Sequence, residues 1–231
     1  IGVKVMTAEY TDISSTVPLS GRIAPAEETA IVPMASGQVT AVHVKVGDYV
    51  KAGTLLFEID KGQVATTYNQ AKAAYDLAAN SYNNMKTLYL EGAISKSDFD
   101  AAEVQYISAR ESYNAAAEAY SYYNVTSPID GYVTSLSVAV GDIAGQQMAA
   151  SVANTDELKI ETTVSEYIAG YIKIGDEVDV YVSTLGDTPY KGTVTAFSPA
   201  PALGTLTYPI TITLDNESGD LMSGMFAEIH S

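Results

Sequence analysis

The residues that could perform catalysis or bind a metal are few and widely spaced. His43 and His230 lie far apart, and neither stands at a metal-ligand spacing from another ligand-type residue. Of the methionines, Met222 and Met225 alone are close in sequence, so core filling explains this residue type better than copper binding. The sequence contains no nucleophile elbow, phosphate-binding loop or HExxH motif. We therefore predict that the protein is not an enzyme and needs neither a cofactor nor a metal.

The composition excludes several other classes of function. Lys and Arg total 12 against 28 Asp and Glu, which gives a net charge of −16. Nucleic-acid binding and attachment to anionic lipid both need a basic surface, so we predict neither. The chain has no cysteine, which excludes disulfides and thiol chemistry, and no apolar run approaches the roughly 18 residues of a membrane span. Because the first residue is Ile1, we expect a signal or anchor upstream of this sequence.

One short β motif occurs twice. GQVTAVHVKVGD at residues 37–48 and GYVTSLSVAVGD at residues 131–142 align at an offset of 94 residues. A strand-turn-strand unit cannot bury its apolar side alone, so we predict that residues 31–60 and 127–151 pack about a pseudo-twofold axis as one split β-sandwich. In the first copy, simple alternation places Val39, Ala41, His43 and Lys45 on one face. The identical pairs are Gly37/Gly131, Val39/Val133, Thr40/Thr134, Val44/Val138, Val46/Val140, Gly47/Gly141 and Asp48/Asp142.

Residues 61–126 have a different character and interrupt this sandwich. Two seams repeat every seven residues, with a ring at most alternate positions and alanine at most of the others, which predicts two antiparallel helices in a coiled-coil hairpin. The rings of one helix should fill the space over the alanines of the other, in an arm about 40 Å long. The seams are Val64, Tyr68, Ala71, Tyr75, Ala78, Tyr82, Met85 and Tyr89, and then Phe99, Ala102, Tyr106, Ala109, Tyr113, Ala116, Tyr120 and Tyr123.

Capping signals mark the ends of these helices. Asp60 with Gln63 predicts a cap at the start of the first helix, and Ser95 with Asp98 predicts a capping box at the start of the second. Gly92 is the expected residue in the left-handed conformation just after the first helix. An arm that projects from its domain contributes little to that domain's core. We therefore predict that its tip contacts a partner or another subunit, through Asn84, Leu88, Leu90, Gly92, Ile94, Ser95 and Ser97.

The remaining sequence predicts a small antiparallel β-barrel from residues 1–30 and 152–231. The stretches LKIETTV, EVDVYVS, KGTVTAF and TYPITITLDN read as strands separated by glycine-containing and aspartate-containing turns. VKVMTAEY, at residues 3–10, is a further predicted strand. The expected fold is therefore α+β and mostly β, with a split sandwich, an inserted helical hairpin and a barrel.

The order and content of these segments resemble the membrane fusion proteins, or HlyD-like periplasmic adaptors. In that family a lipoyl-like domain is interrupted by a helical hairpin and followed by a β-barrel. The halves GQVTAVHVKVGDYVKAGTLLFEID and SPIDGYVTSLSVAVGD resemble the split lipoyl-like domain. The later segments VSEYIAGYIKIGDEVDVYV, YKGTVTAFSPA and ITITLDNESGDLMSGMFAEI resemble the barrel, with Glu166, Gly175, Gly192, Pro199, Asn216, Gly224 and Met225 at matching positions.

The resemblance implies an adaptor outside the cytoplasmic membrane, anchored by an N-terminal segment that this chain does not include. Its partners would be an inner-membrane exporter, either an ABC ATPase or a transporter of the resistance-nodulation-division (RND) class, and further copies of itself in a ring. In Gram-negative members the hairpin tip docks an outer-membrane channel through a basic, Leu and Ser pattern. Leu88 and Ser95 match that pattern, whereas Asn84 replaces the basic residue, which disfavours such a channel. A short, tyrosine-rich arm also suits a Gram-positive ABC-linked adaptor.

Two other functions remain open. Lys61 in the sequence EIDK resembles the modified lysine of a lipoyl or biotinyl carrier protein, but the second half of the sandwich follows much later than in a true carrier. Position at the start of a helix explains this lysine better. The second alternative is a structural coiled-coil module without transport partners.

Overall fold

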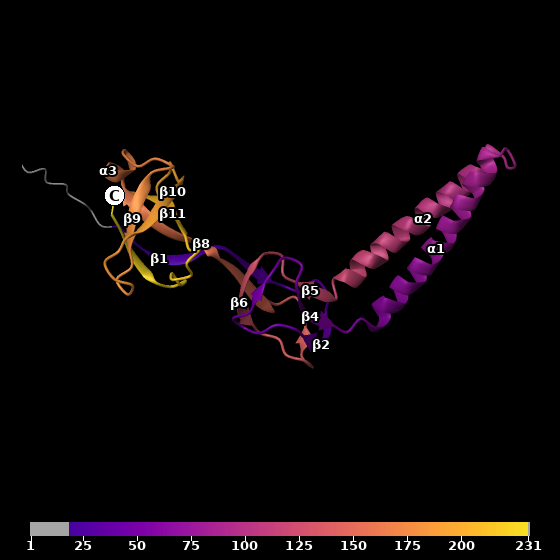
Figure 1. The fold of residues 1–231 in the computed structure, drawn as a ribbon, viewed down its shortest axis with the longest axis horizontal. Helices are drawn as coiled ribbons and strands as arrows, with labels where there is room; N and C mark the ends of the chain where they lie inside the picture. The colour runs from indigo at the N-terminus through magenta and orange to yellow at the C-terminus, as the bar shows by residue number, and fades with distance from the viewer. Residues whose placement is uncertain (1–18, 231) are drawn as a thin grey trace, which may run out of the picture. The chain divides into compact units, whose positions relative to one another are not determined.

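The computed structural model describes residues 19–230, which form two compact units (Figure 1). One unit spans Glu28–Asn154 and holds the repeated β motif and both long helices. The other combines the described residues before Glu28 with those after Asn154. The strand predicted at residues 3–10 lies outside the described residues.

The second of these units is an antiparallel barrel. Its strands pair in the order β1-β12-β9-β10-β11-β8, and an additional β1–β8 pairing closes the ring. The strands predicted from LKIETTV, EVDVYVS, KGTVTAF and TYPITITLDN are confirmed. The strands are β1 (Leu19–Ile31), β8 (Ala150–Ser165), β9 (Glu177–Tyr181), β10 (Tyr190–Phe197), β11 (Thr207–Asp215) and β12 (Phe226–His230), and one short helix, α3 (Glu166–Ala169), follows β8.

Two residues of the family pattern have clear roles in this barrel. Asn216 is buried, and its side-chain amide donates to the carbonyl oxygens of Thr155 and Leu221 and accepts from the Leu221 N–H. The two bonds to Leu221 close the loop after β11, and the bond to Thr155 joins this loop to β8. At Gly192 a Cβ would lie 2.7 Å from the Ile212 side chain, so glycine is needed for close packing of the strands.

The repeated β motif forms one sandwich, as predicted. One sheet has the order β5-β4-β2-β7, and the other has the order β1-β8-β6-β3 through the parts of β1 and β8 that lie in this unit. An offset of 94 residues relates every strand of one sheet to a strand of the other, in the same order. The additional strands are β2 (Gly37–Val42), β3 (Tyr49–Val50), β4 (Leu55–Ile59), β5 (Asn124–Thr126), β6 (Gly131–Leu136) and β7 (Ile143–Ala144).

Hydrogen bonds between the halves follow the same pseudo-twofold symmetry. Val39 N–H donates to the Asp142 carbonyl at 2.8 Å, and Val133 N–H donates to the Asp48 carbonyl at 2.9 Å. Leu56, Phe57 and other aliphatic side chains from both halves make one core. Neither half has this core alone, so the repeat is one interrupted domain.

The predicted alternation in the first copy is wrong beyond Val39. Val39 is 1% exposed, but His43 and Lys45 are exposed and Val44 is buried instead. The reason is a register shift between Val39 and Ala41 against β4, which adds a residue and reverses the phase of the strand.

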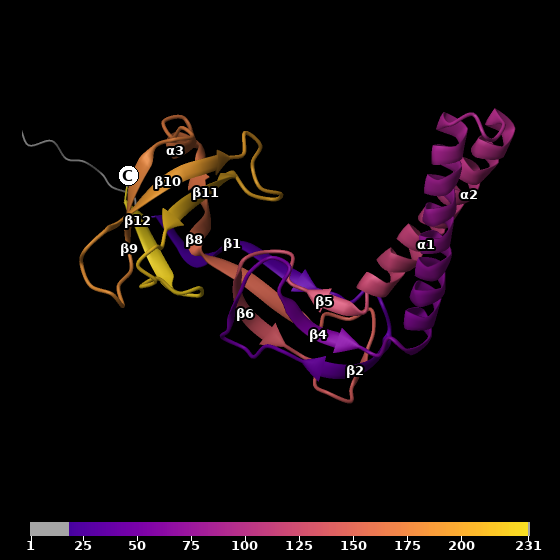
Figure 2. The same ribbon diagram turned by 45° about the vertical axis from the view of Figure 1, so that its right-hand side comes forward.

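Helices α1 (Gly62–Leu90) and α2 (Lys96–Ser121) lie side by side as an antiparallel hairpin (Figure 2). The predicted seams are confirmed from Val64 to Tyr120, because every seam residue is buried or half-buried. The last predicted position, Tyr123, is also half-buried but lies in the turn after α2. Ala78 and Ala116 are the most buried of them. The cap predicted from Asp60 and Gln63 is half correct: the Asp60 carboxylate accepts from Gly62 N–H at 3.1 Å, but the N-cap residue is Lys61 and makes no side-chain cap bond.

The rings of the hairpin also contact one another, which the sequence did not predict. Tyr68, Tyr75 and Tyr82 of α1 each lie between two rings of α2, and Tyr89 ends the stack against Phe99. One continuous stack thus crosses from helix to helix. The neighbouring centroids are 4.8–5.8 Å apart, within the range of favourable aromatic pairs. We call this stack the ring ladder; its order is Tyr120, Tyr68, Tyr113, Tyr75, Tyr106, Tyr82, Phe99 and Tyr89.

Candidate partner-binding surfaces

The hairpin tip is a well-defined turn. Gly92 has φ +73°, and its N–H donates to the Tyr89 carbonyl while Ala93 N–H donates to the Leu88 carbonyl. These two bonds form a Schellman motif, which confirms the predicted position of Gly92. On the other side, Ser95 Oγ accepts from Asp98 N–H at 3.2 Å and caps α2. The tip therefore presents its side chains in fixed positions.

The structure brings the predicted tip residues to one end of the hairpin. Leu90 is 76% exposed and Leu88 is 38% exposed. Asn84 lies one helical turn before Leu88 on the same face of α1 and is exposed. Ser97 is exposed in the first turn of α2, whereas Ile94 is half-buried in the turn. Apolar and uncharged polar groups thus share this end.

Lys96 and Asp98, two charged residues of the tip, have hydrogen-bond partners within the first turns of α2. Lys96 donates to Asp100 at 2.7 Å, and this hydrogen bond raises the pKa of Lys96 above its usual value. The Ser95 hydroxyl donates to the Asp98 carboxylate. The two leucines accordingly stand out as groups without polar character.

The base of the hairpin is tied to the sandwich by an ionic cluster. The Glu58 carboxylate accepts from Lys61 Nζ and contacts His43 Nε2 at 3.0 Å. These hydrogen bonds, first that of Lys61 and then that of His43, lower the pKa of Glu58 below its usual value. Lys61 Nζ also lies 5.6 Å from the centroid of the Tyr120 ring, at the end of the ring ladder. This cluster links strand β4 to both helices.

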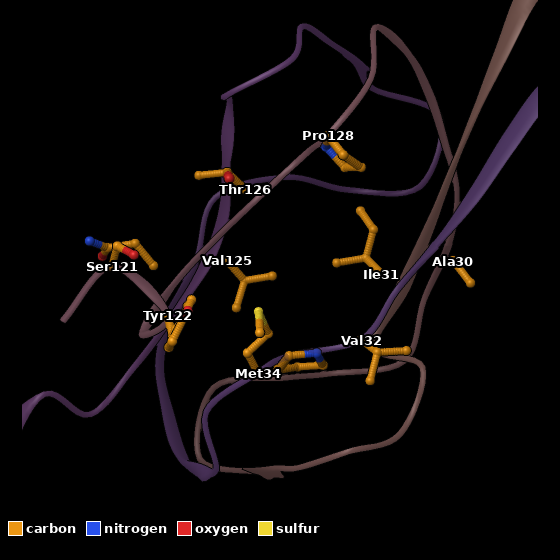
Figure 3. Close-up of a pocket in the computed structure, with 11 residues that line it drawn as sticks. Ala30, Ile31, Val32, Met34, Ser121, Tyr122, Val125, Thr126 and Pro128 are labelled. Atoms are coloured by element: carbon orange, nitrogen blue, oxygen red, sulfur yellow. The ribbon is translucent and has the colours of Figure 1, made fainter. Parts of the chain in front are cut away.

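An apolar pocket of about 550 Å³ opens beside the hairpin base (Figure 3). Ile31, Val125, Pro128 and Met34 surround the same space in this view. The pocket lies between the end of β1 and β5, two strands related by the offset of 94 residues, and each is the outer strand of its sheet. Met34 is 72% exposed at its rim. The absence of charge in residues 30–42 and 119–129 is the one feature of the sequence that points to this pocket.

The barrel exposes a second apolar surface, which the sequence reasoning also missed. Tyr167 and Tyr171, in and after α3, are 76% and 72% exposed, and their rings contact each other. In the loop before β11, Leu203 is fully exposed and Leu206 nearly so. Thr207 pairs with Ser165, which places this loop and α3 at the same end of the barrel. Residues 198–214 carry no charge, and this uncharged run is the feature of the sequence that could have indicated an exposed apolar surface.

Among residues 19–230, no three His, Cys, Asp or Glu side chains are arranged to hold a metal ion. In the same part of the chain, no helix has the length and apolar character to cross a membrane.

Two family models together match nearly the whole chain. The model described as "RND MFP, barrel-sandwich hybrid domain" matches residues 27–155, more than half of the sequence. The model described as "CusB-like, beta-barrel domain" matches residues 157–231. These two segments correspond to the sandwich with its hairpin and to the barrel.

Individual proteins are similar over the same length. Multidrug resistance protein MdtE of Escherichia coli K12 is 26% identical over 255 residues, covering 98% of this chain and 66% of its own length. A chimeric MacA–MexA protein with the Pseudomonas aeruginosa MexA α-hairpin matches with a TM-score of 0.79 and 26% identity, over 94% of this chain and 79% of that one. The membrane fusion protein Spr0693 of Streptococcus pneumoniae R6 shares the fold, with a TM-score of 0.70 and 23% identity over 93% and 98% of the two chains. This chain thus spans slightly less than two thirds of the length of MdtE.

Proposed function

The chain belongs to the RND membrane fusion protein family, and we propose that it is a non-catalytic adaptor subunit of a transmembrane export system. The observation that carries this proposal is the architecture itself: a split sandwich that presents a long helical hairpin and is continued by a barrel. Residues 61–126 would act as the arm, except for β5 (Asn124–Thr126), which belongs to the sheet of the platform. Residues 31–60 and 127–151 would form that platform, and residues 1–30 and 152–231 the barrel domain. The protein would work on the outer side of the cytoplasmic membrane, held there by a segment N-terminal to this chain.

The proposed principal partner is an inner-membrane exporter, of either the ABC or the RND type. The apolar barrel surface around Tyr171 and Leu203 supports a protein contact there, because a patch without charge loses little solvation energy when it is covered. The two exposed leucines at the hairpin tip support a second contact. That tip surface consists of Asn84, Leu88, Leu90, Gly92, Ile94, Ser95 and Ser97. Asn84 at the position of the basic residue argues against an outer-membrane channel as the tip partner.

Self-association into a ring is the third part of the proposal. Every copy carries a charge of −16, so repulsion between copies is smallest where both surfaces lack charge. The edge around the pocket has this property, and so do residues 143–155, which include β7 at the opposite edge of the four-stranded sheet. Contact between opposite edges is heterologous and can close into a ring.

The absence of native cysteine gives a clean test of this contact. In the double variant Met34→Cys with Ile143→Cys, mild oxidation should produce a series of disulfide-linked dimers, trimers and larger multimers, because each copy can be joined on two sides. Each single variant is the matched control and should yield dimers at most. A double variant that also stops at dimers would show that the edges do not meet in this way.

Export by cells that depend on this protein tests the role of the tip. Leu90→Asp should abolish most of the export without changing the folded structure, because the charge would sit in the proposed contact. Val104→Asp is the control, since Val104 is 68% exposed and lies on α2 away from the tip. Equal export by both variants would remove the tip from the proposal.

The carrier function is the alternative. The Lys61 amine is paired with Glu58 and approaches the Tyr120 ring, at the start of α1, so it is not presented on an open hairpin turn. The intact mass of the protein purified from its native cells decides between the two functions, because attached lipoate or biotin would add a discrete mass. A digest would then locate this added mass on the peptide that contains Lys61.

A further inference from the structure

The ring ladder places phenols in an unbroken series inside the hairpin. Six tyrosines follow one another from Tyr120 to Tyr82, with centroids 4.8–5.8 Å apart. Phe99 then separates Tyr82 from Tyr89. Phenylalanine is far harder to oxidise than tyrosine, so the series of oxidisable rings ends at Tyr82. Tyr89 is in contact with the stack but is insulated from the other phenols.

The composition directs one-electron oxidation to these rings. The chain has 17 tyrosines and neither cysteine nor tryptophan, the two side chains that would otherwise compete most strongly. When a tyrosine loses an electron and its phenolic proton, the resulting radical can accept an electron from a neighbouring ring in contact and a proton from water, while the neighbouring phenol releases its own proton to water. A radical formed on any of the six tyrosines can therefore migrate along the ladder until a second radical meets it.

Tyr68 and Tyr113 have a geometry in which these radicals can join. The hydroxyl oxygens of Tyr68 and Tyr113 are 3.3 Å apart, and the two rings are tilted by 41°. Contact between the hydroxyls brings the ortho carbons of the two rings near each other, and tyrosyl radicals couple at those carbons. By contrast, Tyr75 and Tyr113 are stacked at 13°, with the ring faces toward each other. The hydroxyl bond from Tyr68 also raises the pKa of Tyr113 above its usual value.

We propose that Tyr68 and Tyr113 form a site of covalent modification, at which a peroxidase-type oxidant joins α1 to α2 through a dityrosine bond. Hydrogen peroxide, acting through a haem peroxidase, removes one electron and one proton from each phenol and is reduced to two molecules of water. The two radicals form one carbon–carbon bond. The hydrogen atoms on the coupled carbons then return to the phenol oxygens as protons through water, so the product has lost two hydrogen atoms in total.

The bond would change the mechanical state of the hairpin. The two tyrosines are 45 residues apart in sequence and lie in the half of the hairpin near the sandwich. A covalent link here would prevent the helices from separating near their base while leaving the tip free. The hairpin of the modified protein should therefore melt at a higher temperature than that of the unmodified protein.

The test uses the whole chain, treated with horseradish peroxidase and hydrogen peroxide at low protein concentration. Wild type is compared with Tyr68→Phe, Tyr113→Phe and the control Tyr89→Phe, all of which keep the ring and its packing. We expect dityrosine fluorescence in the wild type and in Tyr89→Phe, with most of the signal lost in the other two variants. Mass spectrometry of the digest should find one major cross-linked peptide pair, joining Tyr68 to Tyr113.

Two results would overturn the proposal. Cross-links found mainly between molecules, or at the exposed pair Tyr167 and Tyr171, would show that exposure and not the ladder decides where coupling occurs. A major link at another ladder pair would show that the 3.3 Å hydroxyl contact does not select the site. Circular dichroism of each variant before oxidation checks that the helices are intact.

Discussion

The hairpin and the sandwich that it interrupts are stabilised in different ways. In the sandwich, Leu56, Phe57 and Ile59 of a single strand are completely buried. Among the residues of the two long helices, Ala78 and Ala116 alone are nine-tenths buried, and the rings of the ladder are half-buried. The sandwich thus has an aliphatic core, whereas the hairpin has a seam of contacts between amphipathic rings.

This difference predicts that the two regions unfold in different ways. A buried core unfolds cooperatively, but the half-buried seam of a two-helix hairpin can open locally without loss of the remaining structure. Tyrosine suits such a seam because its hydroxyl stays solvated at the edge of a structure only two helices wide. We therefore expect the hairpin to open locally while the sandwich stays folded.

The largest expected effect comes from the sandwich core. Phe57→Ala should lower the free energy of unfolding by about 3–5 kcal/mol, because it removes a completely buried ring and leaves a cavity. Chemical denaturation followed by circular dichroism measures this loss. An effect below that of a ladder substitution would contradict the contrast between the two regions.

The two copies of the repeat differ in their tolerance of a side chain. At Gly131 a Cβ would clash with the carbonyl of Ala153, whereas at Gly37 it would lie 2.9 Å from a methyl group of Ile59. A backbone carbonyl can move away from a new Cβ less easily than a side-chain methyl can. Gly131→Ala should therefore lower the free energy of unfolding more than Gly37→Ala, each by about 1–3 kcal/mol. Denaturation midpoints of the two variants give the order. Equal losses would mean that the halves pack more alike than the structure shows.

A substitution in the middle of the ladder should loosen the hairpin alone. Tyr75→Ala removes a ring that contacts both Tyr106 and Tyr113, and should destabilise the hairpin by about 1–3 kcal/mol. Hydrogen exchange should accelerate in α1 and α2 and stay unchanged in the sandwich. Tyr75→Phe is the control and should have little effect. Faster exchange throughout the unit would show that the two regions unfold together.

The end of α1 should respond more weakly. Gly92→Ala introduces a Cβ at φ +73° and should destabilise the last turn of α1 by about 1 kcal/mol. The effect is small because the space around this Cβ is open and only the backbone conformation is strained. Hydrogen exchange at the last turn of α1 detects the change. Protection that stays at the wild-type level would contradict the turn described here.

The smallest effect concerns the ionic cluster at the hairpin base. Because the pKa of Glu58 is lower in the folded protein than its usual 4.5, its contribution to stability is present above pH 4.5 and is lost as the pH falls through the folded value. In Glu58→Gln, the free energy of unfolding should therefore fall slightly less steeply than in the wild type as the pH drops below 4.5. Thermal melts of both proteins between about pH 3 and 7 provide the comparison. Identical profiles would remove the cluster as a stabilising contact.

The parts of the fold that depend on local pattern could be predicted from sequence. The repeated GD turns identified the two halves of the sandwich, and the heptad positions of Tyr68 and Tyr113 identified the seams, because both patterns follow directly from backbone periodicity. Gly92 and Ser95 marked the turn through their cap chemistry.

Features that depend on tertiary contacts could not be predicted in the same way. The bulge after Val39 arises from pairing with β4, and the long strand β1 contains Gly21 and Pro25 and shows no clear alternation. The stacking of rings across the helices depends on the axial offset of α1 against α2, which the heptads leave free. The pocket beside Met34 exists only when two distant segments meet.

Photo-crosslinking in native membranes tests the adaptor function most directly. Probes at the tip residues Leu90 and Ser97 and at the barrel residues Tyr171 and Tyr190 would be activated in intact membranes, and the adducts identified by mass spectrometry. The account predicts that the barrel probes capture an ABC permease or an RND transporter, and that the tip probes capture a neighbouring adaptor or a second component of the export system. If every probe captured soluble proteins alone, the adaptor function would be contradicted.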